Sequence, residues 1–103
     1  SQDELMLCAA YLALGARTRL LLADRESYNR AVNGIGELEF VSRVIEFAPM
    51  IEQAWLAMHQ VERDSFDKVW AYEVCEPFGE AYAVAMLTGS TFDPAATLDS
   101  LMN

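Results

Sequence analysis

Residues 5–16 read LMLCAAYLALGA and contain no charged side chain and no side-chain amide. A helix that is apolar all round must be covered on every side, by its own domain, by a partner or by lipid. The run is shorter than the roughly 20 apolar residues that span a bilayer. Asp3 and Glu4 precede it where a secretory signal would carry positive charge. We therefore expect the central helix of a cytoplasmic protein, with the rest of the chain arranged around it.

The composition predicts one acidic helical domain over residues 1–103. Hydrophobic residues make up 53% of the chain, and its formal net charge is −9. Nucleic-acid binding is driven by basic side chains that displace counterions from phosphates, so this charge argues against nucleic acid as a direct ligand. Anionic membrane surfaces are disfavoured for the same reason. We expect neither nucleic acid nor a membrane as a direct partner.

The first helix is predicted over residues 3–32. The pair Asn33-Gly34 is typical of a left-handed helix end. One straight helix of this length would measure about 45 Å. We therefore favour a break or bend at residues 24–27, with a continuous helix as the alternative.

The second helix is predicted over residues 36–61, because apolar residues recur there alternately every four and three positions. This row consists of Phe40, Val44, Phe47, Ile51, Ala54, Met58 and Val61. Proline ordinarily interrupts a helix, but Pro49 falls on the opposite, polar face while the row continues in register. We expect one helix kinked at Pro49 rather than two separate helices.

A third helix is predicted over residues 65–87, with Asp64 as its N-cap and Pro77 on its solvated side, where the helix would bend. The alternative is a strand over residues 69–74, where Val, Trp and Tyr favour β-structure. No second strand-like run is available to pair with it, so the helix is preferred.

A short last helix is predicted after Asp93-Pro94, which match the preferred N-cap and first helical position. The predicted fold is therefore all-α, a bundle of three long helices and a short C-terminal one. The apolar rows of such long helices exceed what three neighbours cover well. We expect a homodimer, with any uncovered side of residues 5–16 as its interface.

Few residues suggest chemistry. Cys8 and Cys75 lie within apolar helical patterns and are interpreted as small buried hydrophobic residues. His59 with Glu62 is a single reversed fragment of the Glu-x-x-His pairs that hold metals in bundles. We expect no catalytic residue, no metal site and no cofactor, and therefore no enzyme.

Charge is distributed unevenly along the chain. Residues 1–36 hold four basic and four acidic residues, whereas residues 37–103 hold three basic and twelve acidic ones. An acidic surface can be purely solvated, but it can also meet a basic partner, where charge speeds association and fixes orientation. The expected partner-binding residues are Glu46, Glu52, Glu62, Asp64, Asp67, Glu73, Glu76 and Glu80.

The function favoured by these patterns is a non-catalytic protein-interaction domain, in its most specific form an inhibitor that covers the basic surface of a nucleic-acid-binding protein. Small acidic helical proteins of this kind are familiar among phage and plasmid accessory proteins, although no motif here connects the chain to them. The alternative is a small-molecule-binding or sensing bundle with an apolar pocket between helices. Its expected lining residues are Phe47, Trp55, Trp70, Phe78 and Tyr82.

Overall fold

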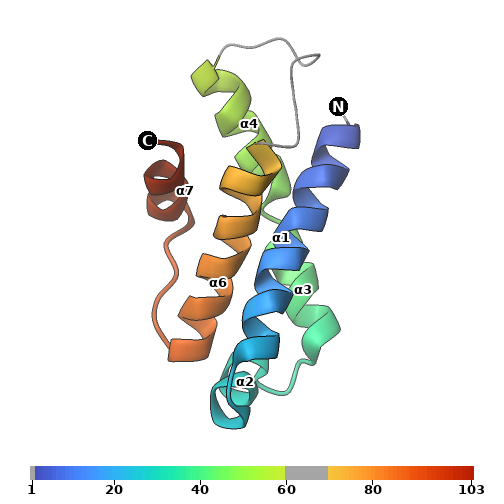
Figure 1. The fold of residues 1–103 in the computed structure, drawn as a ribbon, viewed down its shortest axis with the longest axis vertical. Helices are drawn as coiled ribbons and strands as arrows, with labels where there is room; N and C mark the ends of the chain where they lie inside the picture. The colour runs from blue at the N-terminus through green and yellow to red at the C-terminus, as the bar shows by residue number, and fades with distance from the viewer. Residues whose placement is uncertain (1, 60–69) are drawn as a thin grey trace.

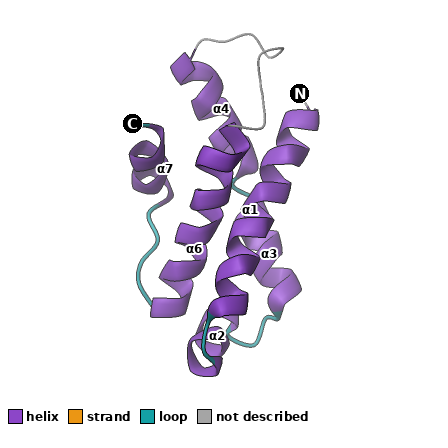
Figure 2. Ribbon diagram, viewed as in Figure 1, coloured by secondary structure: helices purple, strands orange, loops and turns teal. Residues whose placement is uncertain are grey.

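A computed structural model describes residues 2–59 and 70–103, and every regular element in these two ranges is helical (Figure 2). The central helix α1 spans Gln2–Leu22 and carries the uncharged run. Asp3 and Glu4 lie in its first turn and Arg19 in its last, where each charge opposes the helix dipole. The all-α prediction is confirmed for this part of the chain.

The first helix is broken where the sequence suggested. Helix α1 ends at Leu22, and α2 spans Arg25–Val32. The Asp24 carboxylate caps α2 by accepting a hydrogen bond from the Ser27 amide at 2.8 Å. Asn33 ends α2 in the left-handed conformation with a φ of 46°, as the Asn33-Gly34 pair predicted.

The second predicted helix is two helices, so the expectation of one kinked helix was wrong. Helix α3 spans Glu37–Ile45 and α4 spans Ala48–His59. Pro49 lies in the first turn of α4, where its missing N–H has no intrahelical partner to lose. The apolar row nevertheless faces the core on both helices, since Phe40, Val44 and Ile51 are all buried.

The third helix runs through the described residues up to Thr88. A wide π turn, η2 (Ala71–Cys75), leads without interruption into α6 (Glu76–Thr88). The Glu76 amide donates to the carbonyl of Ala71 rather than to that of Tyr72. This wide turn lies directly before Pro77, whose ring requires extra room beside the preceding turn. The strand alternative is wrong for residues 70–74, while Asp64 and residues 65–69 lie outside the described residues.

The last helix, α7 (Pro94–Met102), begins as predicted. Asp93 caps it by accepting a hydrogen bond from the Ala96 amide at 3.0 Å. The count of three long helices and a short one is not confirmed, because breaks at residues 23–24 and 46–47 divide each of the first two predicted helices into two.

Helices α1 and α6 lie side by side at the centre, with α3 and α4 against α1 and α7 on the outer side of α6 (Figure 1). The molecule is elongated, with extents of 44 × 23 × 18 Å. Two glycines allow the central pair to approach closely. A Cβ on Gly15 would overlap the Glu76 carbonyl, and one on Gly79 would overlap the Leu12 carbonyl. The two backbones are therefore in direct contact.

Candidate functional site

The predicted acidic surface is only partly exposed. Glu46, in the turn between α3 and α4, and Glu73, on η2, are exposed and have no ion-pair partner among the described residues. Glu52 is instead buried on α4. Glu62, Asp64 and Asp67 lie outside the described residues.

The remaining two predicted acids, Glu76 and Glu80, are half-buried beside α1. Glu80 lies 3.4 Å from the Arg19 guanidinium. A carboxylate already paired with an arginine of its own chain offers less charge to a partner. Among the described members of the predicted set, Glu46 and Glu73 are thus the most available.

Three glutamates outside the predicted acidic set are paired with arginines of the same chain. Arg17 contacts Glu37 at 3.3 Å, Arg30 contacts Glu26 at 3.9 Å, and Arg43 contacts Glu39 at 3.5 Å. These pairs are well exposed, so each contributes little to stability. Their effect is to neutralise charge on α2 and α3.

The aromatic residues predicted to line a pocket pack against one another. Phe47 lies with its ring centroid 5.4 Å from that of Phe78 and 6.0 Å from that of Tyr82. Trp55 and Trp70 form a second pair at 5.5 Å. Each spacing is that of a direct aromatic contact. Trp70, Phe78 and Tyr82 are buried, Phe47 and Trp55 pack against the core in partly buried positions, and none of the five lines the hollows adjoining α1 or the one between α4 and α7.

Phe92, which the sequence analysis did not single out, joins this aromatic cluster. Its ring meets those of Phe78 and Tyr82 nearly edge to face, at 5.4 and 5.2 Å. Burial within the cluster raises the pKa of the Tyr82 hydroxyl. Phe92 lies in the connection between α6 and α7, where no periodic pattern marks it as part of the core.

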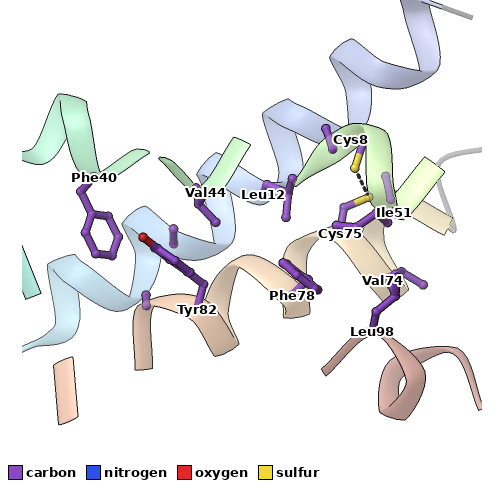
Figure 3. Packing of buried hydrophobic residues seen from close by; sticks show 14 of the residues in the cluster. Cys8, Leu12, Phe40, Val44, Ile51, Val74, Cys75, Phe78, Tyr82 and Leu98 are labelled. Atoms are coloured by element: carbon purple, nitrogen blue, oxygen red, sulfur yellow. Dashed lines mark hydrogen bonds between the residues drawn. The ribbon is translucent and has the colours of Figure 1, made fainter. Parts of the chain in front are cut away.

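The two cysteines meet in the centre of the molecule. The Cys75 thiol donates a hydrogen bond to the Cys8 sulfur at 2.8 Å, and both are fully buried and free (Figure 3). Burial raises the pKa of the Cys75 thiol, and the neighbouring Cys8 raises it further. A thiol held in its neutral form is a poor nucleophile. The prediction that both are buried hydrophobic residues is confirmed.

The two sides of α1 differ in how far the other helices bury them. Its covered face lies in the interior and consists of Cys8, Leu12, Gly15, Ala16 and Leu20. Its open face is exposed and consists of Asp3, Met6, Ala10, Leu14, Arg17 and Leu21.

The open face is apolar except at two positions. Met6 is 69% exposed, Leu14 49% and Leu21 78%. Three large apolar side chains in one row exceed the scattered single ones that ordinary surfaces carry. The sequence predicted that an uncovered side of this helix would be an interface, without naming its residues. The residues of the open face recur every three or four positions along the sequence, as those of the covered face do. The open face could therefore have been identified from the sequence.

Two hollows adjoin the open face. One, of about 410 Å³, follows the open face itself between Ala10 and Leu21. The other, of about 290 Å³, lies between Arg17 and the α3 residues Leu38 and Val41. Leu38 is the most exposed large apolar residue of the described chain. The apolar surface therefore continues from α1 onto α3.

A third hollow, of about 410 Å³, lies between α4 and α7 and is lined mainly by Met50, Ala54, Leu98 and Met102. It is open to solvent, and Asp99 is the one charged residue among those that line it in the described chain. Within residues 2–59 and 70–103 no group of three histidine, cysteine or acidic side chains is placed to hold a metal. His59 ends α4, and the Glu62 that sequence paired with it lies outside these ranges.

By length and composition alone, the stretch Asp3–Leu22 of α1 could cross a membrane. No other helix among the described residues passes this test. The core helix of a soluble protein and an N-terminal signal sequence can both pass it as well. The helix is longer than the uncharged run of residues 5–16, so length alone no longer argues against a span. The expectation that membranes are not partners now rests on the acidic charge.

Comparisons of the chain with protein-family models, with curated proteins and with solved structures found no match.

Proposed function

We propose that this chain is a non-catalytic protein-interaction domain whose open face on α1 is a contact surface. The observation that carries the proposal is the exposed row of Met6, Leu14 and Leu21. A contiguous apolar patch on a water-soluble surface is costly unless a partner covers it. The buried, neutral thiols and the filled aromatic cluster favour a binding role over chemistry or small-molecule capture.

For the rest of the surface we propose a protein partner with a basic face. In the most specific form of this proposal, the chain is an inhibitor that covers the basic surface of a nucleic-acid-binding protein. The support is the net charge of −9 and the exposure of Glu46 and Glu73. Rim charges of this kind act mainly on association rate and orientation. We propose that the protein acts in the cytoplasm without a cofactor.

A photo-reactive amino acid at position 14 tests the first part of the proposal. In an extract of the producing cells, Leu14→benzoylphenylalanine is expected to crosslink to a protein that mass spectrometry identifies and that binds the purified chain directly. The matched control places the same group at Ser42, an exposed position of α3. If position 14 yields no more adduct than position 42, the open face is not a contact surface and the proposal fails.

Charge reversal tests the second part. Binding of a basic protein, captured by the same photo-reactive group at the exposed Tyr72 beside Glu73, is expected to weaken about tenfold in Glu46→Lys/Glu73→Lys. It is also expected to weaken as salt rises, because exposed charges are screened. The control is Glu26→Lys/Asp99→Lys, which changes the net charge equally at two other exposed positions. Binding that is indifferent to salt and to both double variants would exclude an acidic docking surface while leaving the open face in place.

A further inference from the structure

We infer that the occupant of the open face is a second copy of this chain, whose α1 packs antiparallel to the first about a two-fold axis at Ala10. The inference rests on the proposed interaction role of this face and names its partner. Its physical basis is the order of side chains along the face, which is complementary to itself only in this arrangement.

The order of residues determines the direction of pairing. The open face carries two charges, Asp3 at one end and Arg17 towards the other, with apolar residues between them. A parallel pair would place Asp3 against Asp3 and Arg17 against Arg17, and like charges directly opposed are destabilising. An antiparallel pair brings opposite charges together at both ends.

The register follows from the same two charges. When Asp3 lies opposite the partner's Arg17, Met6 lies opposite the partner's Leu14, and Ala10 meets its own copy. The Met6–Leu14 contact and the Asp3–Arg17 contact are then each formed twice, which is the requirement of a two-fold interface. The overlapping segment, residues 3–17, is about 21 Å long. Other registers place a charge either against an apolar side chain or against a like charge.

The residue at the crossing point is small. Ala10 is exposed at the middle of the face, where its methyl group allows two helices to approach closely. Arg17 is exposed, and its Nε donates a hydrogen bond to the Glu37 carboxylate at 3.3 Å. A guanidinium has five N–H donors, so its outer nitrogens remain available to the Asp3 carboxylate of a second copy.

Light scattering and sedimentation of the purified full chain test the inference. The wild type is expected to be a dimer, and Leu14→Asp is expected to dissociate it by a factor above about 100, since two copies of an apolar contact are each replaced by a charge. A wild type that stays monomeric at millimolar concentration would overturn the inference. The position-14 crosslink to another protein would then still support the proposed function.

A pair of charge swaps tests the register. Arg17→Asp alone and Asp3→Arg alone are each expected to weaken dimerisation about tenfold or more, because each sets like charges against one another twice. Mixed in equal amounts, the two variants are expected to recover a dimer, since the two acidic side chains of the first then face the two basic side chains of the second. Glu37→Gln controls for the lost contact of Arg17. Failure to form the mixed dimer would overturn the antiparallel register.

A direct measure of the axis is Ala10→Cys, which is expected to form an intermolecular disulfide with an added disulfide reagent, whereas Thr18→Cys is not. A lipid surface as the occupant is tested by flotation with phosphatidylcholine vesicles. Flotation that Leu14→Asp abolishes, from a protein that is monomeric without vesicles, would overturn the second copy in favour of the bilayer.

Discussion

The two faces of α1 carry similar apolar side chains in opposite surroundings. On the covered face, Leu12 is fully buried; two residues further along, Leu14 is 49% exposed. Both faces are built from leucine, alanine and a sulfur-containing residue. What separates them is Gly15, whose missing side chain lets the backbone of α6 reach this side of the helix. An apolar helix is therefore buried on the side where a neighbour can come close.

Valine substitution at Gly15 is expected to have the largest effect on this difference. A side chain there overlaps the Glu76 carbonyl, which is backbone and cannot move aside without separating α1 from α6. We expect Gly15→Val to lose more than about 4 kcal/mol of unfolding free energy, a range that few single substitutions reach. Ala10→Val on the open face is expected to cost only about 0.5 kcal/mol of helix propensity. Urea titration by circular dichroism, at dilute concentration, measures both.

Alanine at the two leucines compares the faces with identical chemistry. Leu12→Ala is expected to lower the free energy of unfolding by about 2–5 kcal/mol, because a cavity forms in the core. Leu14→Ala is expected to lower it by less than about 1 kcal/mol in the dilute monomer. Denaturant unfolding measures both values. Equal losses would mean that Leu12 is no more buried than Leu14.

High pH is expected to weaken the packing against the covered face through the Cys75 thiol of η2. The unfolded chain releases the Cys75 proton near pH 8.5, whereas the folded chain holds it because burial raises the pKa. The unfolded state therefore binds fewer protons above that pH, and the free energy of unfolding falls as pH rises. Between pH 7.5 and 9.5 we expect a loss of about 1.4 kcal/mol for this thiol.

Urea unfolding at a series of pH values tests this expectation, with Cys75→Ala as the control that lacks the corresponding slope. The series ends at pH 9.5, below the pKa of about 10 at which an unfolded tyrosine is half ionised. A thiol reagent is likewise expected to label Cys8 and Cys75 only after unfolding. Rapid labelling of the native protein would show that this side of α1 is accessible.

The smallest effect is expected at the rim of the covered face. Arg19 and Glu80 join α1 to α6 at 3.4 Å, but both side chains are partly exposed. Exposed pairs contribute about 0.2–1 kcal/mol, so Arg19→Gln is expected to lower the free energy of unfolding by no more than this. The loss should shrink in high salt, and a loss above about 2 kcal/mol would show that the pair, rather than the glycine contact, holds the helices together.

Local signals in the sequence predicted much of the fold. The left-handed end at Asn33, the cap at Asp93 and the buried row of α3 and α4 each depend on residues close in sequence. The break between α3 and α4 was missed for a specific reason. Pro49 is compatible both with a kink in one helix and with the first turn of a new one, and the apolar row keeps its register in either case.

The candidate site depended on contacts between distant residues, which local patterns do not determine. Glycine ordinarily weakens a helix interior, but Gly15 and Gly79 each lie where a side chain would overlap the backbone of the other helix. Glu52 sits beside the apolar row, and only the position of its neighbours makes it buried rather than exposed. The sequence predicted that one side of α1 could remain uncovered. Which residues form that side depends on where α6 packs, and local patterns do not determine this.

The close contact of α1 with α6 also affects how the chain is made. The ribosome synthesises α1, which ends at Leu22, well before α6, which begins at Glu76. At about 5–20 residues per second, α1 waits roughly 3–11 seconds before the synthesis of α6 begins. During that interval α6 does not yet cover α1, so the nascent chain presents the uncharged run of residues 5–16 to chaperones and to other nascent chains.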